Sequence, residues 1–122
     1  MQNDLFLPSF CPEWATNTGR EGIFIPELGK VLIAQELYPD LPWAEANRQH
    51  TLPTYRELCF IYAWKAEINE LLIGHGYPAL PEDRLWTNEE DEENGGHLTV
   101  NFINGCRGHF SCTHFPGFSL VD

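Results

Sequence analysis

Residues 52–58 read LPTYREL, and this stretch decides how the rest of the chain is arranged. Thr54 and Glu57 have the Thr-x-x-Glu spacing of a capping box, in which each side chain binds a backbone N–H of the other residue. Apolar residues then recur at helical spacing: Leu58, Ile61, Ile68, Leu71 and Leu72. Because Gly74 or Gly76 can end a helix, the pattern predicts a helix within residues 52–76, with a break allowed near residues 64–67.

The segment before this helix predicts short elements joined by turns. Residues 1–18 show no periodicity and contain two prolines, so we expect an irregular N-terminal segment. The stretch GIFIPELGKVLIAQ indicates a hairpin of two strands, residues 23–25 and 30–34, around a Pro-Glu-Leu-Gly turn. Residues 39–49 predict a short helix, with Asp40 as its cap and the following proline inside its first turn.

The segment after the helix predicts strands. Residues 85–96, LWTNEEDEENGG, start as a strand and end as an acidic loop. Residues 97–102, HLTVNF, alternate apolar and polar side chains, which predicts a half-buried strand. The Asn-Gly pair that follows is a strong signal for a two-residue hairpin turn, and the chain returns along residues 106–112.

The C-terminal residues complete the predicted fold. A Pro-Gly pair at residues 116–117 predicts one more turn, and FSLVD at residues 118–122 is the candidate last strand. We therefore expect residues 1–122 to form a single α+β domain, in which two helices pack on a small, mostly antiparallel sheet with long loops.

Five pieces of the chain follow one another in a familiar order: GKVLIAQELYPDLPWAEA, LPTYREL, INELL, LWTNEE and HLTVNFING. Together they resemble the Lcl C-terminal domain family, a family of unknown function, over about residues 22–122. The chain departs from the family at residues 49–51, where Gln-His-Thr replaces Trp-Arg, and it lacks the closing Val-Arg repeats. The resemblance implies a C-type-lectin-like fold, which is a scaffold for loops and carries no catalytic motif.

The charge of the chain restricts its partners. It carries 18 acidic residues against 7 Lys and Arg, a formal charge of −11. Phosphate backbones require a basic face, so we expect no nucleic-acid partner. No stretch reaches the ~20 apolar residues of a membrane span, and the N-terminus lacks the pattern of a signal peptide. We expect a soluble, cytoplasmic protein, with a removed leader as the open alternative.

Residues 104–114, NGCRGHFSCTH, hold two cysteines and two histidines, which indicate a metal site, a redox pair or an ordinary strand. In a strand, Cys106, Cys112 and His114 point to one face and His109 points to the other, so all four cannot reach one ion. Six residues of strand span about 20 Å, which is too far for a Cys106–Cys112 disulfide. We expect a strand with free thiols, without a metal or a cofactor.

Two predicted loops, residues 84–97 and 103–117, combine aromatic and polar side chains. The acidic residues 88–94 keep calcium binding open, although they lack the alternating spacing of an EF-hand loop. No catalytic motif is visible, so no catalytic residue is expected. The candidate ligand-binding residues are Arg84, Trp86, Asn88, Glu89, Asn94, Arg107, His109 and His114.

Three functions are open at this point. The first is non-enzymatic recognition of a protein or a glycan through the C-terminal loops. The second is a phage or mobile-element accessory protein that serves assembly or host-surface attachment. The third is a metal- or thiol-dependent enzyme that uses Cys106 and Cys112. We favour the first function because the resemblance is to a scaffold, and the acidity of the chain favours a basic or neutral partner.

Overall fold

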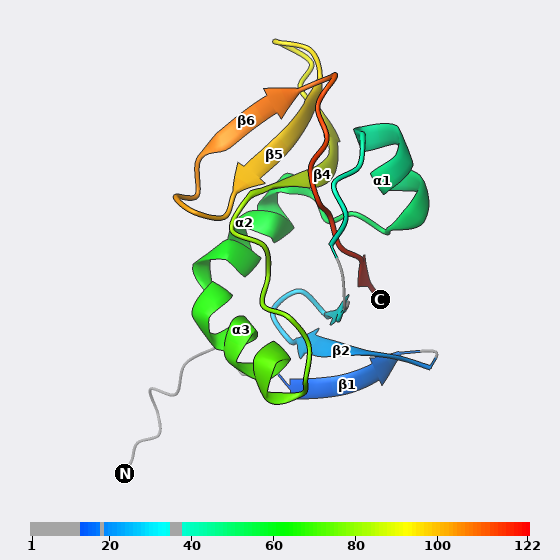
Figure 1. The fold of residues 1–122 in the computed structure, drawn as a ribbon, viewed down its shortest axis with the longest axis vertical. Helices are drawn as coiled ribbons and strands as arrows, with labels where there is room; N and C mark the ends of the chain where they lie inside the picture. Colours follow the sequence, from blue (N-terminus) through cyan, green and yellow to red (C-terminus); the bar gives the residue numbers. More distant parts are fainter. Residues whose placement is uncertain (1–12, 18, 35–37) are drawn as a thin grey trace.

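The computed structural model of this chain describes residues 13–17, 19–34 and 38–122. Figure 1 shows the first strands at the foot of the molecule, α2 and α3 along one side, and β4, β5 and β6 at the top. The elements are β1 (Glu13–Asn17), β2 (Arg20–Ile25), β3 (Lys30–Ile33), α1 (Trp43–Gln49), α2 (Tyr55–Ala63), α3 (Lys65–Gly74), β4 (Arg84–Glu90), β5 (His97–Asn101), β6 (Arg107–Phe110) and β7 (Leu120–Val121).

The lower sheet has four antiparallel strands in the order β1-β2-β3-β7. The predicted hairpin is confirmed between β2 and β3, where Gly29 adopts a φ of 65° and donates its N–H to Ile25 O at 2.9 Å. The predicted last strand is confirmed as β7, which pairs with β3.

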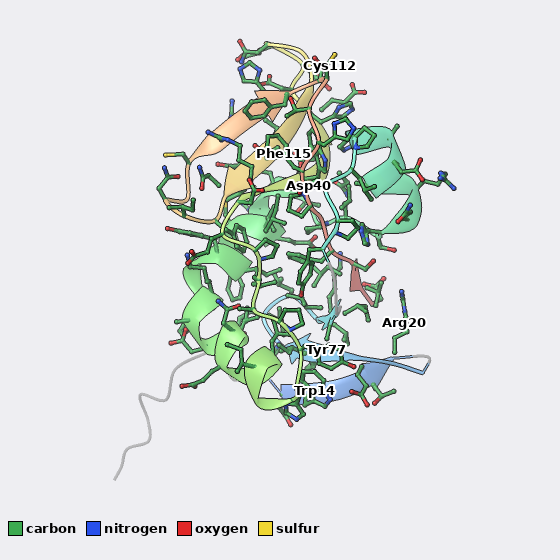
Figure 2. The ribbon with its side chains drawn as sticks, in the orientation of Figure 1. Trp14, Arg20, Asp40, Tyr77, Cys112 and Phe115 are labelled. Atoms are coloured by element: carbon green, nitrogen blue, oxygen red, sulfur yellow. The ribbon has the colours of Figure 1, made fainter. Side chains whose placement is uncertain are left out.

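The predicted irregular segment, residues 1–18, lies outside the described residues at positions 1–12 and 18. The prediction is wrong for β1, which pairs with β2 along its whole length. This strand lies at the edge of the sheet, and the side chains of residues 13–16 are exposed or half-buried. Trp14 packs against the core and stacks on His75, with ring centroids 3.9 Å apart. Figure 2 shows Trp14 close to Tyr77 at the foot of the molecule. Because β1 depends on β2 for its backbone partners, its own pattern could not reveal it.

Helix α1 begins later than the sequence predicts. Its cap is Pro42, which makes no side-chain hydrogen bond, so the predicted capping by Asp40 is wrong. The reason lies in residues far along the chain: Leu41 and Phe115 exchange two backbone hydrogen bonds, each of 3.0 Å. This bridge keeps the backbone extended just before the helix begins.

Helices α2 and α3 confirm both the predicted capping box and the predicted break. Glu57 N–H binds Thr54 Oγ1 at 3.1 Å, and Thr54 N–H binds Glu57 Oε1 at 3.0 Å. The break falls at Trp64, which ends α2 and caps α3 with φ −109° and ψ 22°. Both helices bury their apolar residues in the main core: Leu58, Ile61, Ile68 and Leu72.

The upper sheet is antiparallel in the order β4-β5-β6, and both of its faces are covered. Leu85 and Val100 lie on the face that packs in the main core with α2. Trp86 lies on the opposite face, in a second cluster with Ala46 of α1. Strand β5 is therefore buried on both sides, and Thr99 is 0% exposed, where the sequence predicted a half-buried strand.

The segment before β7 runs extended between the two sheets. Pro116 O accepts the N–H of Trp86 at 3.2 Å, and Ser119 O accepts the N–H of Ile33 at 3.0 Å. Thr51 N–H binds Ser119 Oγ at 3.0 Å. Pro116 and Gly117 are buried and form no turn, so the predicted Pro-Gly turn is wrong. The backbone bonds to both sheets hold these residues straight.

The first turn of α2 joins the two sheets. Glu57 Oε2 accepts a hydrogen bond of 2.7 Å from the ammonium of Lys30 on β3. Glu89 of β4 accepts the N–H of Tyr55 at 2.8 Å, which satisfies another free amide of the helix. The helix N-terminus is thus bonded on one side to the lower sheet and on the other side to the upper sheet.

The fold class is α+β, as predicted, with two corrections. The described residues form three helices and two antiparallel sheets, where the sequence predicted two helices on one sheet. The predicted acidic loop is also shorter than expected, because β4 continues to Glu90. None of the helices in the described part of the chain is long and apolar enough to cross a membrane.

The Lys30–Glu57 pair makes stability depend on pH. Burial raises the pKa of Glu57 and is the largest single influence, but hydrogen bonds from Lys30 and Thr54 together hold it below its ordinary value of 4.5. Because the unfolded chain takes up this proton more readily, the contribution is present above about pH 4.5 and is lost as the pH falls below it. We expect Glu57→Gln to lower the free energy of unfolding at neutral pH by about 1–3 kcal/mol, measured by urea unfolding.

Glu45→Gln is the matched control, because Glu45 pairs with Arg48 on the exposed side of α1. It should cost at most about 0.5 kcal/mol. Equal losses in the two variants would contradict a special role for Glu57.

Candidate ligand-binding surface

The prediction of a two-residue turn between β5 and β6 is wrong, because the turn is longer. Phe102 is fully buried, and its N–H binds Asp83 O at 2.9 Å, so the chain stays bonded to the segment before β4 for one residue after β5 ends. Gly105 then closes the loop with a φ of 79° and donates its N–H to Asn101 O. Burial of the phenylalanine ring, which the local sequence does not determine, sets the length of this loop.

Two asparagine side chains fix the conformation of the same loop. Asn101 Oδ1 accepts the N–H of Ile103 at 2.8 Å, and Asn104 Oδ1 accepts the N–H of Cys106 at 2.9 Å. The loop therefore presents Ile103 on a backbone that is held in place, and the side chain is 63% exposed. In the described chain, Ile73 of α3 is the other large apolar residue with comparable exposure, 62%.

Strand β6 forms the outer edge of the upper sheet, and its second edge has no partner strand among the residues described. Asn101 N–H binds Cys106 O at 2.9 Å. Since hydrogen-bonded and non-bonded pairs alternate in an antiparallel ladder, the backbone groups of Arg107 and His109 point away from β5. Both side chains are exposed, and the Arg107 guanidinium lies 5.9 Å from the ring centre of Tyr55.

The other face of the upper sheet carries a cluster of aromatic rings. His97 stacks on Trp43 of α1, with ring centroids 3.7 Å apart, and meets the edge of Trp86 at 6.4 Å. Both indole N–H groups are satisfied: Trp43 donates to Thr87 O and Trp86 donates to Leu41 O, each at 2.8 Å. These bonds attach α1 and the segment before it to the sheet.

The surroundings of His97 favour its neutral form by lowering its pKa. Burial lowers its pKa, and the carboxylate of Glu90, 3.8 Å from Nε2, acts in the opposite direction but does not restore the ordinary value. Its Nδ1 is buried and has no hydrogen-bond partner among the described residues. A proton added to this ring would be poorly solvated.

The turn between β4 and β5 is built around Asp91. Its carboxylate accepts the backbone N–H groups of Glu93 and Asn94 and the side-chain amide of Asn94, each at 3.1 Å. The amide of Asn94 contributes most to lowering the pKa of Asp91. Both carboxylate oxygens are thus engaged in holding the turn, although most of the neighbouring acidic side chains are exposed.

The predicted site residues separate into four groups. Trp86 is fully buried and offers no surface to a ligand in this structure, while Glu89 and Asn94 make the helix-capping and turn contacts described above. Arg84 lies over the ring of Phe110, with its guanidinium carbon 5.0 Å from the ring centre. The remaining residues are exposed: Asn88, Arg107, His109 and His114. Of these, the structure brings Arg107 and His109 together on one face of β6.

The cysteines do not converge. Cys59, Cys106 and Cys112 are free, and Cys11 lies outside the described residues. Cys106 precedes β6 and Cys112 follows it; Figure 2 shows Cys112 at the top of the molecule. Within residues 13–17, 19–34 and 38–122, no three metal-ligating side chains form a group that could hold an ion.

Sequence reasoning missed two residues that define this region. Ile103 follows the alternating run of β5 directly, and an isolated apolar residue inside an Asn-rich turn was the available signal. Thr99 gave no signal, because a threonine on the polar face of a predicted half-buried strand is expected to be exposed. Its burial depends on residues outside β5.

Comparison with known proteins gave no match: no family model, no curated protein and no solved structure matches this chain. The fold and the surface described above are therefore the basis for the function proposed below.

Because His97 is buried, the stability of the fold should differ between mildly acidic and neutral solution. Since its pKa is lower in the folded state than the ordinary 6.5, the unfolded chain binds the proton more readily, and stability falls as the pH drops below this value. We expect His97→Phe to reduce the loss of stability between about pH 7.5 and about pH 5.5, measured by chemical unfolding with Trp fluorescence.

His50, whose pKa is lowered mainly by burial, should account for part of the pH dependence of stability that remains in this variant. His114→Gln, in the exposed loop after β6, is the control and should keep the wild-type dependence. If the stability of His97→Phe depended on pH as it does in the wild type, the His97 ring would not be the cause of that dependence.

Proposed function

We propose that this chain is a non-enzymatic recognition domain that binds a protein ligand through the outer edge of β6 and the loop at residues 102–106. One observation carries the proposal: the described part of the chain leaves the second edge of β6 unpaired, beside the exposed Ile103. An unpaired sheet edge can receive an extended peptide, whose backbone supplies affinity while neighbouring side chains supply specificity.

The shape of the surface supports an extended ligand. The described residues enclose no pocket, so the contact area would be an open face and an edge. Ile103, in the loop that leads into β6, supplies an apolar anchor, and Arg107 and His109 of β6 supply polar contacts. This combination of one apolar anchor with polar neighbours is typical of a protein-binding patch.

Among the two ligand classes predicted from the sequence, the contacts favour a protein over a glycan. Sugar rings are commonly bound by stacking on exposed aromatic side chains. In the upper half of this molecule the largest aromatic rings, Trp43 and Trp86, use their faces and N–H groups inside the fold. The exposed side chains at the edge are aliphatic, basic or imidazole.

We also propose that the scaffold is C-type-lectin-like and related to the Lcl C-terminal domain family. The combination of three helices with two small antiparallel sheets is compatible with that resemblance. The LPTYREL stretch caps α2, and LWTNEE supplies both Trp86 of the second cluster and Glu89 at the helix N-terminus. The quoted motifs thus have structural roles, as expected for a scaffold.

A random peptide library displayed on phage tests the proposal. We expect enriched peptides that bind the wild-type protein and shift the amide resonances of Arg107 and His109 in nuclear magnetic resonance spectra. Ile103→Ser should weaken these peptides about tenfold or more, because the apolar anchor is lost. Ile73→Ser is the matched control, with nearly the same exposure on α3, and should leave binding unchanged.

Two results would contradict the proposal. One is the absence of any enriched peptide that binds the folded protein. The other is enrichment of peptides that shift resonances elsewhere and lose affinity equally in the two serine variants.

A further inference from the structure

The hairpin of β5 and β6 belongs to a part of this chain that has no acidic side chain. The chain carries 18 Asp and Glu residues, yet none of them falls within residues 97–121. This stretch supplies β5, the loop after it, β6 and β7. The free edge of β6 is therefore built from neutral and basic residues, and its local charge differs from the charge of the whole molecule.

Three of the seven Lys and Arg residues belong to β6 or contact it or the loop before it. Arg107 is part of β6 itself and is exposed. On the opposite face of the sheet, Arg84 rests on the ring of Phe110. Lys65 of α3 donates a hydrogen bond from its ammonium to a backbone carbonyl of the loop. Positive charge thus lies on both faces of β6 and beside the loop that precedes it.

Arg107 is the charge in this group that a ligand can contact. In the described part of the chain, no carboxylate lies within ion-pair distance of its guanidinium, whereas Lys30 and Arg48 are both paired with glutamates. The ring of Tyr55, with its centre 5.9 Å away, attracts the guanidinium without neutralising its charge. An acidic chain therefore keeps one exposed arginine without a carboxylate partner at its free sheet edge.

The other end of β6 has negative charges beside it. Phe110 pairs with His97 at the start of β5, next to the turn between β4 and β5. That turn and the end of β4 carry Glu90, Glu92 and Glu93, whose side chains are exposed. A strand laid along β6 would meet a positive charge at the first residue of β6 and negative charges near its last.

We infer that the free edge of β6 binds an extended peptide that carries an acidic side chain opposite Arg107. In an antiparallel pair, residues directly opposite each other have side chains on the same face, with Cβ atoms about 4.5–5.5 Å apart. The planar guanidinium can bind both oxygens of a carboxylate at that position. Because the chain carries a formal charge of −11, a single acidic residue is favoured over a run of acidic residues or a polyphosphate chain.

This inference rests on the proposed function and makes it more specific. Ile103 lies in the loop that leads into Arg107, so the peptide side chain that contacts Ile103 should be close in sequence to the acidic one. Toward the other end of β6, neutral or basic side chains avoid repulsion by the glutamates of the turn. The net charge of this chain favours a basic or neutral partner, and the charge at β6 adds one acidic position to that partner.

The peptides that the wild-type protein enriches from the random phage library test this inference. We expect most of them to carry Asp or Glu close to an apolar residue. Arg107→Met should weaken binding of the most enriched peptide, made synthetically, by about two- to fivefold, and high salt should reduce this difference. Arg20→Met is the matched control, since Arg20 is exposed on the lower sheet, far from β6 (Figure 2), and it should bind the peptide like the wild type.

A charge exchange separates a direct contact from an effect of net charge. Arg107→Glu should weaken the same peptide more than Arg107→Met does. A second peptide, in which Lys replaces the acidic residue, should recover affinity for Arg107→Glu and lose affinity for the wild type. Arg20→Glu changes the net charge by the same amount and should show neither effect, and nuclear magnetic resonance spectra establish that each variant is folded.

The possible results separate this inference from the proposed function. Peptides that shift the amides of Arg107 and His109 but carry no enriched acidic residue, or that bind a folded Arg107→Met like the wild type, would overturn the inference alone. Equal losses in Arg107→Glu and Arg20→Glu would also overturn it. Displacement of the peptide by an equal concentration of an oligothymidylate would replace the carboxylate by a phosphate ligand. Absence of any enriched peptide would overturn both the inference and the proposed function.

Discussion

The rest of the structure depends on the carboxylate of Glu57. It accepts the N–H of Thr54 at the start of α2 and the ammonium of Lys30 on β3, so one side chain caps a helix and attaches it to a sheet. Such charge-assisted bonds contribute about 1.5–3 kcal/mol each. Glu89 completes the junction from the upper sheet through the N–H of Tyr55. The two sheets are thereby fixed relative to one helix N-terminus, and the position of β6 follows from that.

The upper sheet buries the middle residues of β4 and β5 on both of its faces. Its inner face packs in the main core, and its outer face is covered by α1 and the aromatic cluster around Trp86. The recognition proposed above therefore falls on the edge and the loops, where Ile103 and Arg107 are exposed. The same double coverage explains why Thr99 and His97 are inside, with polar atoms that no described residue satisfies.

Features determined by neighbouring residues could be predicted from the sequence. The capping box at Thr54, the break at Trp64 and the turn at Gly29 each depend on a few consecutive positions. Features determined by distant residues could not. The start of α1 depends on a bridge to Phe115, and the length of the loop after β5 depends on where the ring of Phe102 is buried.

The candidate site shows the same division between local and distant causes. Arg107 and His109 were found because exposed polar residues in a predicted hairpin are visible in the sequence. The burial of Trp86 and Thr99 and the packing of Arg84 on the ring of Phe110 were not visible, because each depends on packing between elements separated along the chain. A sequence pattern shows which side chains are polar, and only packing shows which of them lack a partner.

The extended segment at residues 115–121 has a consequence for the order of folding. It bonds to Leu41, Trp86 and Ile33, and its end supplies β7, so the two sheets cannot both be completed until this late segment docks. Contacts of such long sequence separation slow the search for the native topology. Once the segment is in place, its release would open β3 and uncover Trp86 together. The two halves of the molecule therefore gain and lose their structure as one cooperative unit.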